Sequence, residues 1–352
     1  MRVSNRIVRE DLEYITRCDL PWSAFKDKTI LVTGAAGFLP AYMVETLLFL
    51  NETKALGCTV IGMVRNLDRA KKRFADYASS SDLVLIEADV VNRYPWNYNF
   101  DFIIHAASQA SPKYYETDPV GTMTANILGT YNLLEYIKGK NCLGFLYFSS
   151  GEVYGTPTKN LVGEKDYGYL DITNTRSCYG ESKRASETLG YCYLKQYNVP
   201  FKVVRPSHTY GPGLLLNDGR VFADFIRDAL VGKEITIKSN GTAARPFCYL
   251  SDATVAFYTV LLNASPGYAY NVANTSAFLT VHELAEIISK LGLQGNIPIK
   301  FTNAVIIKDA FIKSAAPKPD ITLINNLGWN PKIMADVGFK RTLDYFRLSN
   351  ET

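Results

Sequence analysis

The sequence is poor in metal-binding and redox-active residues. Its 352 residues include three histidines and six cysteines, with no Cys-x-x-Cys pair and no cluster at metal-ligand spacing, so we expect no metal site. No hydrophobic run reaches the ~18 residues of a membrane span, and residues 1–20 contain no apolar signal segment, so no membrane partner is expected. The cysteines are interpreted as reduced thiols of a cytoplasmic protein, and they are Cys18, Cys58, Cys142, Cys178, Cys192 and Cys248.

The sequence also lacks a strong charge of either sign. The formal net charge is +4, and the densest basic patch, residues 69–73, is expected to be a solvated helix face rather than a nucleic-acid site. Hydrophobic residues make up 47% of the chain, which is enough for a sizeable core. The length allows one large α/β domain with a smaller lobe, and a small anionic molecule is the expected partner.

A glycine turn between an apolar strand and a helix is the most informative stretch that is present. The strand is Ile30-Leu31-Val32-Thr33, and the glycines that follow permit a tight turn and a close approach to a pyrophosphate at the helix N-terminus. The third glycine position carries Pro40, which is tolerated in a first helical turn. The stretch predicts a dinucleotide site rather than an ordinary strand-to-helix turn. Its expected cofactor contacts are Gly34, Ala36, Gly37, Phe38 and Leu39.

Further apolar strands follow, with helical segments between them. This alternation is typical of a parallel, doubly wound sheet of Rossmann type. They are predicted over 58–64, 83–90, 101–105 and 144–150. The predicted organisation comprises a short helical arm over 1–27 for packing or dimer contact, a Rossmann domain over 28–205, and a smaller substrate-binding lobe over 206–352, interleaved with it. A last helix is expected near 337–346.

The ends of these strands supply further candidate cofactor contacts. Arg65 stands where NAD enzymes commonly carry a carboxylate for the ribose, so it favours the extra phosphate of NADP, unless it is only a solvated charge. NAD and NADP both stay open. His105 is predicted to be a packed, hydrogen-bonded histidine rather than a base, because its small apolar neighbours offer no relay partner. The other expected contacts are Asn66, Asp89, Val90, Ala106 and Ala107.

Tyr179 and Lys183 form the candidate catalytic pair. Four residues apart on a helix, they share one face, so the ammonium is expected to lie near the phenol. A neighbouring positive charge favours phenolate and would lower the pKa of ~10 towards neutrality. The pair therefore predicts a general base for an alcohol proton, and Ser150 ends a strand just upstream.

With these residues the chain resembles the nucleotide-sugar branch of the extended short-chain dehydrogenase/reductase family, from about residue 28 to 346. The matching motifs are Thr33-Gly34-Ala35-Ala36-Gly37, Asp89-Val90, His105-Ala106-Ala107, Ser150 with Tyr179 and Lys183, Arg205-Pro206 with Tyr210-Gly211-Pro212, and Arg245 with Tyr249-Leu250-Ser251-Asp252. Within the branch it is most similar to the UDP-glucuronate decarboxylases, through segments at 107–112, 176–179, 217–221 and 318–321.

The resemblance implies a reaction that begins with transient oxidation at sugar C4. Tyr179 would take the C4 hydroxyl proton, Ser150 would orient and relay it, and hydride would pass to a tightly bound, recycled NAD or NADP. Lys183 would hold the cofactor ribose and keep Tyr179 acidic. The resulting ketone activates C5, because a carbonyl stabilises an adjacent carbanion.

Four positions bear on the next step. Glu152 occupies the place of a glutamate in the decarboxylases and 4,6-dehydratases, where it can exchange the C5 proton, unless it merely caps a nearby loop. Gly151 stands where the dehydratases carry an aspartate and the decarboxylases a serine. His208 replaces a usual asparagine, and Pro317 replaces an arginine that binds the glucuronate carboxylate.

Decarboxylation of a UDP-uronic acid is therefore the leading expectation. The alternatives are 4,6-dehydration, epimerisation at C4 or C5, oxidation at C4, and a catalytically silent cofactor-binding dimer. The resemblance also implies a homodimer through a four-helix bundle of helices near 121–137 and 179–196. The expected substrate contacts are Ser108, Ser111, Glu152, His208, Arg220 and Arg245.

Overall fold

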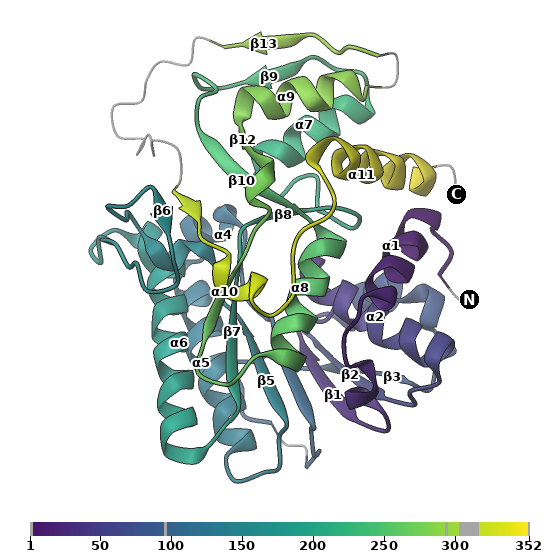
Figure 1. Ribbon diagram of the computed structural model, residues 1–352, viewed down its shortest axis with the longest axis vertical. Helices are drawn as coiled ribbons and strands as arrows, with labels where there is room; N and C mark the ends of the chain where they lie inside the picture. Colours follow the sequence, from purple (N-terminus) through teal and green to yellow (C-terminus); the bar gives the residue numbers. More distant parts are fainter. Residues whose placement is uncertain (1–2, 95–96, 293–294, 303–316, 351–352) are drawn as a thin grey trace.

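A computed structural model describes residues 3–94, 97–292, 295–302 and 317–350 of the chain. Its largest element is a parallel seven-stranded sheet in the order β11-β7-β5-β4-β1-β2-β3, which confirms the predicted doubly wound fold (Figure 1). The strands are β1 (Thr29–Thr33), β2 (Thr59–Val64), β3 (Leu83–Glu87), β4 (Phe102–His105), β5 (Gly144–Phe148), β7 (Phe201–Pro206) and β11 (Ala269–Val272). The connection reverses direction between β1 and β4, which pair in parallel with Thr33 opposite His105. Open α/β sheets bind their ligands at such a switch point.

Helices cover both faces of this sheet because its strands are apolar on both sides. Alternate residues of β1 point to opposite cores: Ile30 and Val32 to one, and Leu31 to the other. The first core is covered by α1 (Arg6–Arg17), α2 (Phe38–Lys54) and α8 (Leu250–Asn263). The second is covered by α5 (Pro119–Ile137) and α6 (Cys178–Tyr197), which pack against each other.

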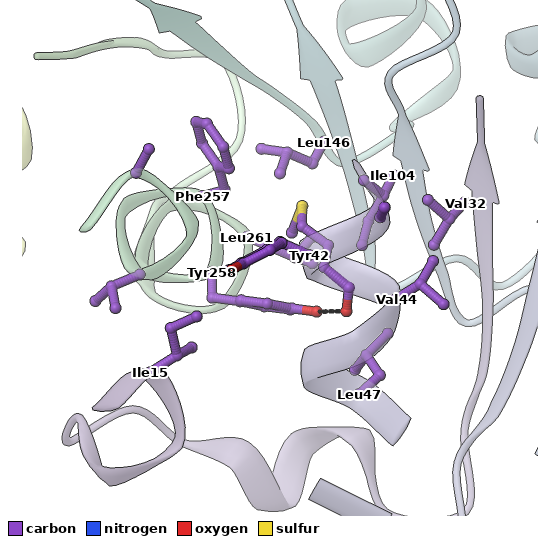
Figure 2. Close-up of a cluster of buried hydrophobic side chains, with 14 of the residues drawn as sticks. Ile15, Val32, Tyr42, Val44, Leu47, Ile104, Leu146, Phe257, Tyr258 and Leu261 are labelled. Atoms are coloured by element: carbon purple, nitrogen blue, oxygen red, sulfur yellow. Dashed lines mark hydrogen bonds between the residues drawn. The ribbon is translucent and has the colours of Figure 1, made fainter. Parts of the chain in front are cut away.

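The first core joins the N-terminal arm to the sheet. Figure 2 shows Ile15 of α1, Val32 of β1 and Tyr258 of α8 arranged around α2. The Tyr258 hydroxyl donates to the Met43 carbonyl at 2.6 Å, so a buried polar group is satisfied without leaving the core. The arm continues through a 3₁₀ turn over Trp22–Phe25. Within the arm expected over 1–27, the described residues thus form a helix over Arg6–Arg17 that packs into this core.

A smaller lobe is formed by the later part of the chain, above the sheet in Figure 1. Its core includes Phe339, whose ring stacks on that of Tyr210 at 3.8 Å between centroids. The helix expected near 337–346 is confirmed and runs over Ala335–Asn350 as α11. Other elements of the lobe are β8 (His208–Tyr210), α7 (Val221–Leu230), β9 (Ile235–Ile237), β10 (Ala244–Tyr249), β12 (Phe278–Thr280), α9 (Val281–Lys290) and β13 (Ile299–Phe301).

Short elements complete the described chain. They are α3 (Leu67–Arg73), α4 (Pro112–Thr117), β6 (Leu161–Val162), β14 (Lys318–Pro319), α10 (Thr322–Asn325) and the 3₁₀ helices over Ala75–Tyr77, Gly151–Tyr154, Thr175–Ser177 and Thr275–Ala277. The expectation of a fully solvated basic face at 69–73 is wrong for Arg73. Its guanidinium turns inward and pairs with the buried Glu45 at 2.8 Å. None of the helices in the described ranges combines the length and hydrophobicity that a membrane crossing requires.

Candidate active site

The glycine turn lies at the carboxyl end of β1, beside the switch point. Gly34 has a φ of +66°, and a Cβ built there would come within 2.9 Å of the Ala107 Cα. Gly37 is the N-cap of α2 and provides no side-chain cap, so the first N–H groups of the helix face outward from the turn. Pro40 lies in the first helical turn, as predicted. This cradle, which a side chain at Gly34 would fill, fits a dinucleotide pyrophosphate.

The loop after β4 forms the other wall of the crevice. Thr33 Oγ1 accepts from the Ala107 N–H at 3.1 Å and bonds with His105 Nδ1 at 2.8 Å. His105 also contacts Thr130 Oγ1 at 3.1 Å, and burial lowers its pKa to about 3, so it is neutral. The prediction of a packed, hydrogen-bonded histidine is confirmed. Ser108, in the same loop, has a buried Oγ without a hydrogen-bond partner among the described residues.

The candidate adenosine contacts lie at the carboxyl ends of β2 and β3. Arg65 is exposed, and its positive charge contributes to lowering the pKa of Asp118 after the hydrogen bonds from Gln109 and Gly121. Asn66 caps α3 by accepting from the Arg69 N–H at 2.8 Å. Asp89 Oδ1 accepts from the Val91 N–H, and Val90 is buried. The expected set around the turn and these strand ends is therefore brought to one edge of the sheet: Gly34, Ala36, Gly37, Phe38, Leu39, Arg65, Asn66, Asp89, Val90, Ala106 and Ala107.

Tyr179 and Lys183 both lie in the first two turns of α6 and are buried. The Lys183 Nζ donates to the Phe148 carbonyl at 2.6 Å and lies 5.6 Å from the centroid of the Tyr179 ring. Burial lowers the pKa of Lys183 to about 7, and the nearby Glu187 raises it in part. The shared helix face predicted for the pair is confirmed.

The predicted acidification of Tyr179 by the protein is wrong. Burial raises the pKa of Tyr179 to about 12, although a hydrogen bond with Ser150 opposes the rise. A buried phenolate loses its hydration, and Lys183 directs its ammonium to the Phe148 carbonyl instead of the phenol oxygen. Protein groups alone therefore do not make Tyr179 a base near neutral pH.

Ser150 and Glu152 lie at the start of the 3₁₀ helix over Gly151–Tyr154. Ser150 Oγ caps this helix by accepting from the Glu152 N–H at 3.2 Å. The Glu152 carboxylate is half-buried and pairs with Arg176 Nη2 at 3.4 Å. Glu152 is therefore not the cap of this loop, because Ser150 has that role.

Two side chains were absent from the predicted site. The Tyr115 ring stacks on Tyr179 at 4.8 Å between centroids, and the Arg176 guanidinium lies 4.6 Å from the Tyr115 ring. Arg176 could have been suspected from its place three residues before Tyr179. Tyr115 lies within α4, which follows the loop after β4, so no local pattern indicates that it meets α6.

The start of α4 and a loop of the lobe bring candidate substrate residues together near Tyr179. Ser111 Oγ donates to the Asp218 carbonyl at 2.8 Å, and Arg220 Nε pairs with Asp218 Oδ2 at 3.3 Å. Burial lowers the pKa of Arg245 on β10, while the charge of Glu152 opposes this. The charge of Arg220 likewise acts on Tyr179. Three arginines, at 176, 220 and 245, thus lie around Tyr179 and Glu152.

Two positions depart from the decarboxylase pattern: one lies on β8 of the lobe, and the other directly precedes β14, which pairs with β6. The His208 ring packs against Phe222 and Phe247, at 6.5 and 5.9 Å between centroids. Pro317 is half-buried directly before β14, which packs near β10. Within the described residues, no group of histidine, cysteine, aspartate and glutamate is arranged to hold a metal ion.

A buried ion pair holds together the elements that carry the catalytic residues. Arg205 donates to Glu187 through Nε at 2.9 Å and Nη2 at 2.5 Å. Its Nη1 donates to the Tyr154 hydroxyl at 2.9 Å, and Nη2 to that of Tyr167 at 2.8 Å. Glu187 is one turn beyond Lys183, and Tyr154 ends the 3₁₀ helix that carries Glu152. Arg205 thus fixes the helix of the catalytic pair to the loop of the carboxylate.

Comparisons with known proteins agree with this geometry. Residues 30–273 match the NAD dependent epimerase/dehydratase family. UDP-glucuronic acid decarboxylase 1 of Xenopus tropicalis is 33% identical over 323 residues, 91% of this chain and 72% of that protein. UDP-glucuronic acid decarboxylase 6 of Arabidopsis thaliana is 33% identical over 320 residues, 91% of this chain and 89% of that protein.

Solved structures show the same fold. An epimerase from Methanothermobacter thermautotrophicus superposes with a TM-score of 0.81 at 19% identity, covering 98% of this chain and 97% of that one. UDP-glucuronic acid 4-epimerase from Bacillus cereus, solved with UDP-glucuronic acid and NAD, superposes with a TM-score of 0.74 at 22% identity, covering 91% and 99%.

Proposed function

The chain belongs to the NAD dependent epimerase/dehydratase family, and from this membership we propose that it decarboxylates a UDP-uronic acid through transient oxidation at sugar C4. It is an NAD-dependent enzyme that modifies nucleotide sugars, as its decarboxylase relatives indicate. The observation that carries the named reaction is a carboxylate and an arginine, Glu152 and Arg176, paired beside the stacked Tyr179. The family description supports NAD as the cofactor, and Arg65 is exposed at the end of β2.

The first step needs a base at the C4 hydroxyl. When bound, NAD supplies the oxidation by accepting hydride from the sugar carbon and returning it at the end. Tyr179 takes the hydroxyl proton, and Ser150, hydrogen-bonded to it, orients the hydroxyl. Because burial raises the pKa of Tyr179 to about 12, this role depends on positive charge close to the phenol: Arg220 and Arg176 lower the pKa in part, and the oxidised cofactor would add to them when bound.

The second step breaks the bond between C5 and the carboxylate carbon. Its electrons pass to the C4 ketone, carbon dioxide leaves, and C5 takes a proton, for which we propose Glu152 as the donor. Arg176 supports this step as the guanidinium next to Glu152, since an arginine holds a sugar carboxylate in bidentate fashion. It would serve in place of the arginine expected at Pro317.

A neutral sugar is the second candidate substrate, favoured by Pro317. Without an arginine at that position, a 4,6-dehydratase or an epimerase reaction on a UDP-hexose fits the same Ser150, Tyr179 and Lys183. Gly151 weighs against dehydration, because it offers no acid for the departing hydroxyl.

Mass spectrometry of UDP-glucuronate incubated with the purified protein, without added NAD, tests the proposal. The expected product has lost one carbon dioxide, and the Tyr179→Phe variant yields none. Loss of water from UDP-glucose, or an inverted C4 with unchanged mass, would replace decarboxylation by dehydration or epimerisation. No conversion of any nucleotide sugar would favour a silent cofactor-binding protein.

We further propose a homodimer in which α5 and α6 form half of a four-helix bundle. Exposed apolar side chains on α5 support it, because such a stripe is normally covered. They are Val120, Met123, Leu128 and Tyr131, with 71, 37, 44 and 42% exposure. A light-scattering mass of one chain at micromolar concentration would contradict the dimer.

The six free cysteines support the proposed cytoplasmic location.

A further inference from the structure

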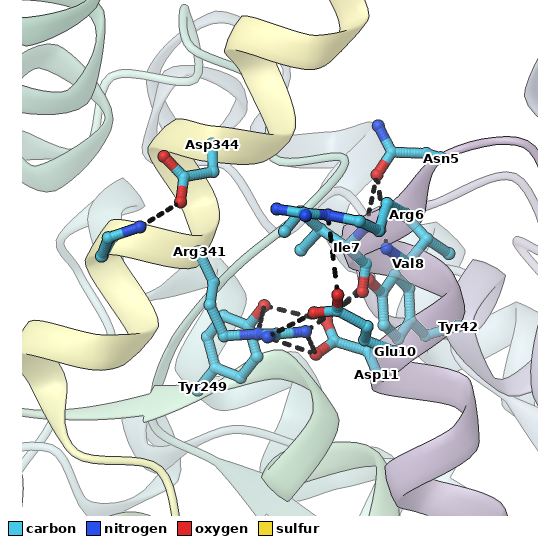
Figure 3. Close-up of polar contacts among 11 residues, drawn as sticks. Asn5, Arg6, Ile7, Val8, Glu10, Asp11, Tyr42, Tyr249, Arg341 and Asp344 are labelled. Atoms are coloured by element: carbon cyan, nitrogen blue, oxygen red, sulfur yellow. Dashed lines mark hydrogen bonds and ion pairs between the residues drawn. The ribbon is translucent and has the colours of Figure 1, made fainter. Parts of the chain in front are cut away.

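The N-terminal arm contains a buried carboxylate that the proposed chemistry does not use. Asp11 on α1 is 1% exposed. It accepts from the Tyr42 hydroxyl at 3.1 Å and the Tyr249 hydroxyl at 2.8 Å, and it pairs with Arg341 Nη2 at 2.8 Å (Figure 3). A buried charge is stable only when it is paired and hydrogen-bonded, so these partners are held at fixed positions around it.

The partners of Asp11 come from both halves of the molecule. Tyr42 lies on α2, the helix that begins at the glycine turn. Tyr249 ends β10, the strand that carries Arg245, and Arg341 lies on α11 of the small lobe. One carboxylate therefore connects the helix expected to bind the cofactor phosphates with the strand that carries the expected substrate contact Arg245.

A second contact between the arm and the path to α11 lies close by. The Tyr14 hydroxyl donates to Asp252 Oδ1 at 2.7 Å. The other oxygen of Asp252 accepts from the backbone N–H groups of Lys332 and Ile333 at 2.8 and 2.7 Å. These two residues precede α11, so the arm restrains the lobe at two separate points.

We propose that Asp11 is a positioning residue: it clasps the small lobe to the cofactor-binding helix and thereby sets the affinity for the nucleotide sugar. This rests on the proposed function in one respect, that the crevice binds a nucleotide sugar. The position of Arg245 relative to α2 then depends on the clasp, because Asp11 bonds both elements through Tyr249 and Tyr42.

The charge of Asp11 makes the clasp sensitive to pH. Burial raises the pKa of Asp11 to about 6, and Arg341 and the two tyrosine hydroxyls lower it in part. The groups that face it are Tyr42 from α2, Tyr249 from β10, Arg341 from α11 and Glu10 from its own helix, which also pairs with Arg341. Because the pKa is raised in the folded chain, protonation relieves the cost of burial while it removes the ion pair with Arg341. Protonation of Asp11 therefore favours the folded, clasped chain, and the neutral carboxyl can still accept from Tyr42 and Tyr249 while it loses its charge opposite Arg341.

The test compares binding of UDP-glucuronate with and without the charge at Asp11. Calorimetry is done on the full chain with Tyr179→Phe, so that nothing is turned over, at pH 8 and pH 5.5, and NAD content is measured in parallel. At pH 8, Asp11→Asn is expected to weaken binding by about tenfold, the value of one charged hydrogen bond. At pH 5.5 the two affinities are expected to converge, because most of Asp11 is then protonated and, like the asparagine of the variant, uncharged. NAD content is unchanged.

The matched control is Glu13→Gln on the same helix. Glu13 pairs with Arg17 at 3.1 Å at the surface and contacts no part of the lobe through that pair. It is expected to change binding at neither pH. Equal affinities for Asp11→Asn and its parent at pH 8, or the same loss at both pH values, would overturn the clasp.

A second variant covers the case in which Asp11→Asn does not fold. Tyr249→Phe keeps the carboxylate and the ring but removes the bond to β10, and about threefold weaker binding is expected. Unchanged binding there would also contradict the clasp. If the protein with intact Tyr179 binds UDP-glucuronate but does not convert it, the proposed reaction fails while the affinity comparison still decides the role of Asp11.

Discussion

The cofactor side and the substrate side of the crevice are built in different ways. The part of the cofactor side around the pyrophosphate turn comes from neighbours in sequence: β1, the turn at Gly34 and the start of α2 form one continuous stretch. The substrate side depends on distant contacts, such as Ser111 with Asp218, 107 positions apart, and Asp11 with Tyr249, 238 apart. The turn forms within one stretch of the chain, whereas the substrate side forms only when distant segments are folded against each other.

The chemistry lies between these two sides, and Tyr179→Phe should affect it most. Loss of a general base lowers kcat by about 10²–10⁴-fold. The affinity for UDP-glucuronate and the NAD content should stay unchanged, because the ring still stacks on Tyr115. Steady-state kinetics and calorimetry measure these. A variant that keeps the wild-type kcat would show that Tyr179 is not the base.

Distant contacts should contribute more to stability than local ones. Glu187→Gln leaves Arg205 buried without its partner, so the free energy of unfolding should fall by about 3–5 kcal/mol. The control on the same helix, Glu181→Gln, removes a partly exposed pair with Arg184 at 3.1 Å, and about 0–1 kcal/mol is expected. Urea unfolding compares the two. Equal losses would remove the distinction between buried and surface pairs on α6.

Cofactor binding by the glycine turn should be sensitive to one added methyl group. Gly34→Ala puts a Cβ against the Ala107 backbone at a positive φ, and we expect about tenfold weaker retention of NAD from strain of about 1–3 kcal/mol. Gly139→Ala is the control, since it has a φ of +76° but open space around it. It should lose stability only. Absorbance of the extracted cofactor reports the difference, and equal retention in both variants would contradict the role of the turn.

The same contrast explains what the sequence could predict. The apolar runs and the glycine turn correctly predicted a parallel, doubly wound sheet, and the spacing of Tyr179 and Lys183 correctly placed them on one helix face. These inferences use interactions within a few residues. The stacking of Tyr115 on Tyr179 and the pairing of Glu152 with Arg176 could not be derived, because they form between segments that only the tertiary fold brings together.

Burial was the other property that local patterns missed. Lys183 was expected to acidify Tyr179, but the pKa of Tyr179 rises to about 12 because the phenol is enclosed from several elements at once. Arg73 was expected in solvent because nothing in residues 69–73 indicates that it pairs with Glu45 on α2. The pKa and the ion pairs of a side chain depend on its burial and on all the charges around it. Most of these come from other segments, so a short stretch of sequence does not reveal them.

The central claim is that oxidation at C4 is followed by chemistry at C5, and isotope incorporation tests it most directly. UDP-glucuronate is incubated with the protein in deuterium oxide, and the product is examined by mass spectrometry and NMR. The account predicts a product that has lost carbon dioxide and carries one deuterium at C5, because the proton added there comes from solvent. A product that keeps its carboxylate and carries no deuterium at C5 would show that the chemistry ends at C4, and would contradict the roles proposed for Glu152 and Arg176.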